Sequence, residues 1–187
     1  MKRFFALLLL PVLSGCLSTT VVPASYWPVE YKGGASSSPS SKFGVARVLP
    51  IVVRAPYNAR ALTVLRTDGT VAFDPLNEFA APPAQLAKGV LVDALTTSGL
   101  FRDVVETSSI ASADVSVEVV VERLALDCRQ EGTRTAVADV VVKVLKGHAI
   151  AASVKGSGAV GAADGNYGAA FSGALSSALV MALGQLR

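Results

Sequence analysis

Residues 114–128 read DVSVEVVVERLALDC, and this stretch decides the fold. Its valines at 115, 117, 119 and 121 fall on every second position, a period typical of a β-strand with one buried face. After Val121 the apolar positions move to Leu124, Leu126 and Cys128, which have the opposite parity. Because a slip of one residue turns every side chain to the other face of a sheet, we expect a β-bulge or sharp twist near residues 122–123.

Two further strands are expected directly downstream. Residues 133–146 place alanines and valines on alternate positions, and Lys146-Gly147-His148 turns the chain into a third strand that begins at Ala149. These stretches predict an antiparallel meander near 115–128, 133–146 and 149–159 with one solvated face. Residues 156–168 hold five glycines and are predicted to form a loop before the last helix.

Upstream, residues 43–53 are dense in apolar and β-branched side chains, which predicts a strand buried on both faces. Pro50 should end this strand or mark a bulge, because proline has no N–H to donate. Residues 61–66 and 71–74 flank Asp68-Gly69, which predicts a hairpin with a type I′ turn. A short strand is expected at Val104-Val105, followed by a loop over 110–113.

Two helices complete the pattern. Pro82-Pro83 precedes residues 84–98, where apolar side chains recur at intervals of three and four and Gly99 suits a left-handed cap. The last helix is expected from Tyr167 or Gly168 to Leu186, with Phe171 on its apolar stripe. Its other faces carry alanine, serine and glycine in place of charge. We therefore expect this helix to be packed on two sides or to take part in an oligomer contact.

This order of elements predicts an α+β fold. We expect a two-layer sandwich in which one mainly antiparallel sheet carries two helices packed on one face.

The start of the chain has the layout of a secretory signal peptide. Met1-Lys2-Arg3 is cationic, and an apolar run follows from Phe4 to Leu13 that is too short for a stable membrane span. Leu13, Ser14, Gly15 and Cys16 then resemble the lipobox of bacterial lipoproteins. In that interpretation residues 1–15 are removed, and Cys16 carries a diacylglycerol and an N-acyl lipid that anchor the protein to a membrane. The alternative is an ordinary secretory signal in which the cysteine is incidental.

Residues 16–41 are predicted to form the lipidated N-terminus and a flexible tether, because serine, threonine, proline and glycine dominate them. One piece of the tether, residues 26–31, is too aromatic for a pure spacer. It is either a short strand on the domain edge, the interpretation we favour, or a contact for a membrane or partner. Tyr26, Trp27, Tyr31 and Phe171 are therefore candidate partner contacts. Residues 42–187 should form a single domain.

The residue inventory does not favour catalysis. Without Lys2 and Arg3 the net charge of +3 falls to +1, and no cluster of lysine and arginine indicates nucleic acid. Cys128 is predicted to be a small buried hydrophobe, and His148 a turn residue with no metal-ligand neighbours in the sequence. The glycines at 156, 158 and 161 mimic a dinucleotide-binding spacing without the strand–helix context that such a site needs. We expect neither an enzyme, a metal nor a cofactor beyond the lipid on Cys16.

Several stretches resemble the ABC-type transport auxiliary lipoproteins, the family of paraquat-inducible protein C. They are Tyr26-Trp27-Pro28-Val29, the strand ending Val48-Leu49-Pro50, Asn77-Glu78-Phe79-Ala80-Ala81-Pro82-Pro83, and Leu95-Thr96-Thr97-Ser98-Gly99-Leu100-Phe101. The resemblance covers nearly the whole mature chain, although its motifs are loose outside the helix region. Phe79 stands where the family usually has a tryptophan, which keeps an aromatic side chain and loses an indole N–H.

The resemblance implies a non-enzymatic auxiliary subunit of a transporter that moves lipids or organic solvents between membranes. Its partner would be a mammalian-cell-entry-type substrate-binding protein. A homo-oligomer is expected only from the uncharged faces of the last helix, not from the resemblance. Leu17 is not the aspartate associated with inner-membrane retention, which favours the periplasmic face of the outer membrane. The alternative function is a lipoprotein that binds a lipid itself, as a carrier or in envelope assembly.

Overall fold

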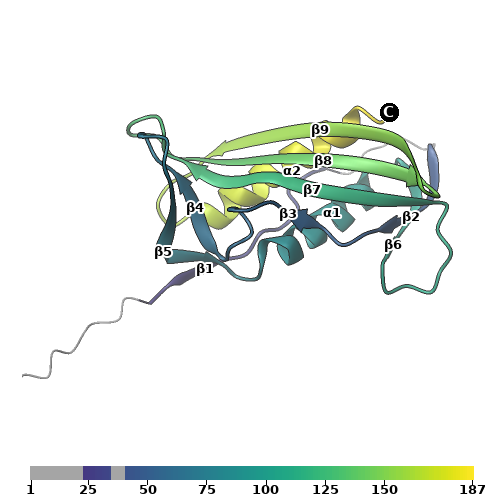
Figure 1. Ribbon diagram of the computed structural model, residues 1–187, viewed down its shortest axis with the longest axis horizontal. Coiled ribbons are helices and arrows are strands. Elements are labelled where there is room, and N and C mark those ends of the chain that lie inside the picture. The colour runs from purple at the N-terminus through teal and green to yellow at the C-terminus, as the bar shows by residue number, and fades with distance from the viewer. Residues whose placement is uncertain (1–22, 35–40) are drawn as a thin grey trace, which may run out of the picture.

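The computed structural model describes residues 23–34 and 41–187, and within them it forms one mixed sheet and two helices (Figure 1). The strands are β1 (Ser25–Trp27), β2 (Phe43–Val48), β3 (Val52–Val53), β4 (Ala61–Leu65), β5 (Val71–Phe79), β6 (Phe101–Glu106), β7 (Val115–Asp127), β8 (Thr135–Lys146) and β9 (Ala149–Gly161). The helices are α1 (Pro83–Ser98) and α2 (Tyr167–Gly184). Strands and helices form two layers, as expected for an α+β sandwich.

β7 is the strand on which the sheet is built. One of its edges pairs antiparallel with β8 over nearly its whole length, and β8 pairs in turn with β9, which confirms the meander. The other edge is shared by three short strands in parallel, first β2, then β3, then β4. The register of β7 on β8 shifts between Val121 and Arg123, where the sequence pattern predicts a bulge.

The sheet contains more parallel pairing than the sequence suggested. The antiparallel pairings are β4–β5, β7–β8 and β8–β9, and the last two are the longest in the sheet. The parallel pairings are short, and two of them join β1 to β5 and β2 to β6. Most paired residues are therefore antiparallel. β7 itself is antiparallel to β8 on one edge and parallel to β2, β3 and β4 on the other.

The hairpin of β4 and β5 forms where Asp68-Gly69 predicts it, but its turn is not of type I′. A type I′ turn needs a positive φ at both of its central residues. Gly69 has a φ of 81°, but Asp68 does not have a positive φ, because among the described residues only glycines do. Asp68 instead stabilises the turn with its side chain, which accepts the N–H of Thr70 at 2.9 Å. Pro50 lies between β2 and β3, so it ends the first strand as predicted.

Helix α1 begins at Pro83 and ends at the predicted cap. Gly99 adopts the left-handed conformation, with a φ of 69°. Leu100 and Phe101 then turn back into the core, where they are 4% and 6% exposed. The cap therefore both stops the helix and starts β6.

Of the stretch 156–168 that was predicted to be a loop, residues 156–161 form the second half of β9, residues 162–166 form a loop, and α2 begins at Tyr167. A Cβ at Gly156 would lie 1.9 Å from the carbonyl oxygen of Ala178, and one at Gly158 would lie 1.9 Å from that of Ala174. The prediction was wrong for residues 156–161. Gly156 and Gly158 are there because the absence of a side chain lets the backbone of α2 lie directly on β9.

Helix α2 is packed on more than one side, which explains its lack of charge. It contacts β8, β9 and α1, and the predicted stripe is buried. Among the described residues it is the one helix long and apolar enough to cross a bilayer by length and composition, yet 67% of that stretch is buried inside the protein. The packing accounts for most of its apolar character, while Val180 and Met181 stay exposed.

The core lies between the helices and the inner face of the sheet. Its largest fully buried side chains come from both helices and from strands of the sheet: Phe79, Phe171, Leu62, Leu91, Leu95, Leu175, Leu179, Val48, Val90, Val117, Val119 and Val121. The opposite face of the sheet is partly solvated and carries cross-strand ion pairs, while Leu65, Ala125 and Val137 form a small second buried cluster on it. Lys143 on β8 meets Glu118 on β7 at 2.8 Å, directly across the ladder.

Candidate functional site

The segment that precedes β2 is fastened to the fold through β1. Trp27 donates its indole N–H to Asn77 Oδ1 at 3.0 Å, and Asn77 in turn donates to Asp74 Oδ2 at 2.8 Å. The indole ring also meets the ring of Tyr167 edge to face, with centroids 5.7 Å apart. These contacts make Trp27 a structural anchor of the N-terminal segment.

After β1 the chain runs along α2. The backbone N–H of Glu30 donates to Ser172 Oγ at 2.9 Å, and that of Lys32 donates to Ser176 Oγ at 2.8 Å. Both serines are buried helix residues. Ser172 and Ser176 therefore have a structural role on this uncharged face of α2, because they accept hydrogen bonds from backbone N–H groups of the segment that follows β1. Part of the predicted tether is thus integral to the fold.

The four candidate contact residues lie in different environments. Tyr26 is 58% exposed on the outer face, and the guanidinium of Arg60 stacks over its ring at 5.5 Å. Trp27 and Tyr31 are half-buried against the core. Phe171 is fully buried and packs edge to face on Phe79. Its expected role as a surface contact is corrected: the apolar stripe of α2 faces the core, so only Tyr26 offers a well-exposed ring.

The predicted lipidation site and lipobox, Leu13, Ser14, Gly15 and Cys16, lie outside the described residues.

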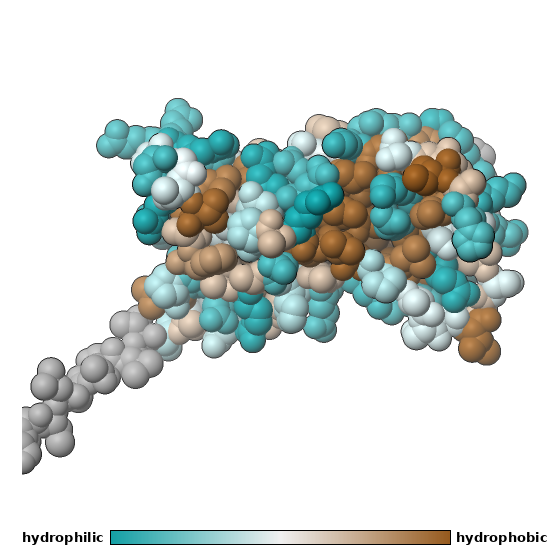
Figure 2. Space-filling model, in the orientation of Figure 1, coloured by the Kyte–Doolittle hydropathy of each residue, from teal (hydrophilic) through white to brown (hydrophobic). Residues whose placement is uncertain are grey.

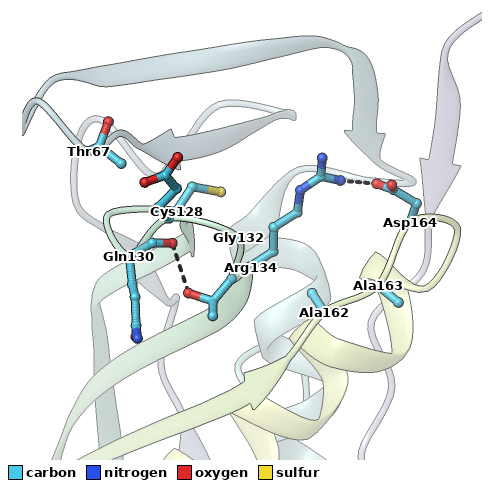
Figure 3. Close-up of a pocket in the computed structure, with 10 residues that line it drawn as sticks. Thr67, Cys128, Gln130, Gly132, Arg134, Ala162, Ala163 and Asp164 are labelled. Atoms are coloured by element: carbon cyan, nitrogen blue, oxygen red, sulfur yellow. Dashed lines mark hydrogen bonds and ion pairs between the residues drawn. The ribbon is translucent and has the colours of Figure 1, made fainter.

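An open depression lies where the β7–β8 turn meets the loop after β9 (Figure 3). Arg134 projects across it and pairs with Asp164, and the same guanidinium donates to the hydroxyl of Tyr167 at 2.8 Å. The other residues that line the depression are mainly small or polar: Thr67, Cys128, Gln130, Glu131, Gly132, Thr133, Ala162 and Ala163. The Arg134 network links the start of β8 to the start of α2, which holds this end of the sheet together.

Two ionisable side chains beside this depression, Cys128 and Asp127, have shifted pKa values. Burial raises the pKa of the Cys128 thiol, and this effect exceeds the opposing influence of the Arg134 charge. The thiol is therefore protonated at neutral pH and is a poor nucleophile. The guanidinium of Arg129, which hydrogen-bonds the carboxylate of Asp127, lowers the pKa of that carboxyl group. Cys128 is half-buried just beyond the end of β7, and so more exposed than the predicted core position.

His148 lies in the exposed turn between β8 and β9, where the sequence placed it. Within residues 23–34 and 41–187, no group of three or more histidine, cysteine, aspartate or glutamate side chains is arranged to hold a metal ion.

No protein-family model and no curated protein matches the sequence. Among solved structures, protein XCC0632 of Xanthomonas campestris, from family DUF330, aligns with a TM-score of 0.68 and 16% identity over 87% of this chain and 92% of that one. An uncharacterised protein aligns with a TM-score of 0.59 and 13% identity over 88% and 96% of the two chains. A PelC dodecamer from Paraburkholderia phytofirmans gives a TM-score of 0.47, with 15% identity over 81% and 92%.

The first two alignments span almost the entire length of both chains. At such low identity they show a shared architecture and nothing finer. The chain therefore has the fold of the Xanthomonas campestris DUF330 protein.

Proposed function

We propose that this chain is a lipid-anchored protein of the bacterial envelope that acts through contacts with other molecules and has no catalytic activity. The observation that carries the proposal is Leu13-Ser14-Gly15-Cys16 after a short apolar run. The fold agrees with an anchor at that end, because β1 begins only nine residues after Cys16 and is hydrogen-bonded into the sheet. The anchor would consist of covalent lipid on Cys16, and no other cofactor is proposed.

The finer proposal is an auxiliary subunit of an ABC-type transporter that moves lipids or organic solvents between membranes. Its support is the resemblance of residues 77–83 and 95–101 to the ABC-type transport auxiliary lipoproteins. In the structure these residues form the end of β5, the entry to α1 and its cap, so the resembling residues join both layers. The partner would be a mammalian-cell-entry-type substrate-binding protein, met at the periplasmic face of the outer membrane.

The anchor is tested by labelling cells with radioactive palmitate. The wild-type chain should take up label and remain in the membrane fraction, whereas Cys16→Ser should be unlabelled and unprocessed. A Cys128→Ser control should be labelled like the wild type. Incorporation that persists in Cys16→Ser would refute the anchor.

The partner is tested by cross-linking in intact cells, followed by affinity purification of the tagged chain from detergent extracts. Recovery of a mammalian-cell-entry-type protein together with an ATPase and a permease is expected. Purification that yields none of these subunits, from cells that express them, would refute the transporter role and leave the anchor standing.

The alternative, a carrier that holds lipid between sheet and helices, has less support. That space is filled by fully buried side chains, among them Phe79, Phe171, Leu91 and Leu175. The tight seat of α2 on Gly156 and Gly158 leaves no room for an acyl chain there.

A further inference from the structure

A group of apolar side chains is exposed on the arm formed by β1, β4 and β5. Tyr26 is 58% exposed, Val71 46%, Phe73 51% and Leu76 45%, values high for large apolar residues. Figure 2 shows apolar surface over this arm, separate from a second area over β3 and the middle of β7. We call the four residues the arm patch.

The register of the sheet places three of the four patch residues, Tyr26, Val71 and Phe73, on one face. Val71 pairs with Leu65 and Phe73 with Thr63, while Tyr26 pairs with Glu78, which itself lies opposite Ala61. Paired residues share a face, as do residues two apart on β4, so all of these side chains belong to the face away from the helices. Leu76 lies in the irregular part of β5, where Asp74 accepts its N–H at 2.9 Å.

The chain enters the fold beside this patch. β1 is parallel to β5, and Ser25 lies opposite Asn77. β1 therefore begins beside Asn77, the residue that follows Leu76 on β5. Fully extended, residues 17–24 could reach only about 28 Å. The 13-residue β7 alone spans about 43 Å, and its far end lies at the opposite end of the molecule from the arm (Figure 1).

The polar groups around the patch suit a bilayer surface. Arg60 stacks over the ring of Tyr26 and pairs with Glu78 at 3.6 Å, so an amphipathic ring lies next to a cation. Tyrosine is enriched at the level of lipid headgroups, and arginine can keep its charge in water while its stem covers apolar surface. The hairpin tip with Asp68 extends beyond the apolar positions and is polar.

We propose that the arm patch rests in the boundary between headgroups and acyl chains of the membrane that holds Cys16. The inference rests on the proposed lipid anchor and adds an orientation to it: the protein lies with the outer face of β1 and β5 against the bilayer. The short connection argues for this occupant over a protein partner, because residues 17–24 can span at most about 28 Å between Cys16 and β1.

The test uses the acylated full chain in vesicles of phosphatidylethanolamine and phosphatidylglycerol, with and without brominated acyl chains that quench tryptophan. Reporter variants are Phe73→Trp and, as an independent second, Leu76→Trp. Val52→Trp is the matched control, because Val52 is 53% exposed on β3, outside the arm. The wild-type chain, whose only tryptophan is Trp27, supplies the background emission.

We expect both arm reporters to show blue-shifted emission, most of which brominated lipid removes, and the Val52 reporter to show neither. Equal quenching of all three variants, or no quenching of either arm reporter, would overturn the inference. A blue shift without quenching would assign the patch to a second copy or another protein, which also overturns it. If the wild-type chain floats with vesicles while the arm reporters stay unquenched, only the orientation fails. If it does not float, the anchor fails as well.

Discussion

Because α2 packs directly on the backbone of β9, we predict that a single added methyl group lowers the stability of the protein markedly. In Gly158→Ala the new Cβ would lie 1.9 Å from the carbonyl oxygen of Ala174 and 2.9 Å from the backbone nitrogen of Ala178. Ordinary carbon–oxygen contact requires about 3.4 Å, so the helix must move away by roughly 1.5 Å. Overpacking costs about 1–3 kcal/mol, and the upper end applies because the opposing atoms are backbone that no rotamer change can remove.

Part of this cost is offset in the unfolded chain, because replacing glycine by alanine removes about 0.4–1 kcal/mol of conformational freedom. The net loss is about 2 kcal/mol, which for a chain of this length lowers Tm by about 4–8 °C. The assay is thermal unfolding followed by circular dichroism, with urea unfolding as a second measure of the free energy.

Gly161→Ala is the matched control on the same strand. No atom lies within 4 Å of the position that its methyl group would take, and its φ is not left-handed, so Tm should stay constant or rise slightly. If Gly158→Ala and Gly161→Ala unfold at the same temperature, the close approach of α2 to β9 is refuted.

Three further outcomes follow from the N-terminal segment and the thiol. Trp27→Phe keeps a ring against Tyr167 but loses the bond to Asn77, so it should cost about 1 kcal/mol and speed hydrogen exchange in β1; unchanged exchange would contradict the anchoring role. Ser172→Ala leaves the Glu30 N–H unpaired, should cost about 1–2 kcal/mol, and should expose the segment to limited proteolysis, whereas Ser177→Ala should not. Because burial raises its pKa, Cys128 should react with maleimide more slowly than free cysteine, and its rate should rise at higher pH than that of free cysteine.

Most of the strands and helices could be predicted because they have a clear hydrophobic period and a clear stop signal. The parity change after Val121 located a real bulge, and Gly99 located the end of α1. Local signals of this kind act within a few residues, so they do not depend on the rest of the fold.

What could not be predicted depends on contacts between distant residues. Glycines at 156 and 158 have the composition of a loop, and only the approach of α2 shows why they lie in a strand. Parallel pairing of β2, β3 and β4 on β7 leaves no mark in their own residues, because a short apolar run does not reveal the direction in which a strand pairs.

The roles of the candidate contact residues could be predicted only in part, because they too depend on contacts between distant residues. An exposed ring at Tyr26 and an anchoring ring at Trp27 are neighbours with opposite roles, and the alternation of a strand explains the difference only once β1 is known to pair with β5. The arm patch was missed because Val71 and Phe73 have the pattern of an ordinary hairpin strand. A count of large apolar residues on both faces of that hairpin would have been the available signal.

The position of β7 has a consequence for how the chain acquires its structure. Synthesis proceeds from the N-terminus, so β2, β3 and β4 emerge long before the strand whose edge they share. Until residues 115–127 arrive, β3 has no strand to pair with, and β2 and β4 each have one unpaired edge, a condition that favours association between chains. A chain truncated just before β7 should therefore aggregate more readily than the full-length chain.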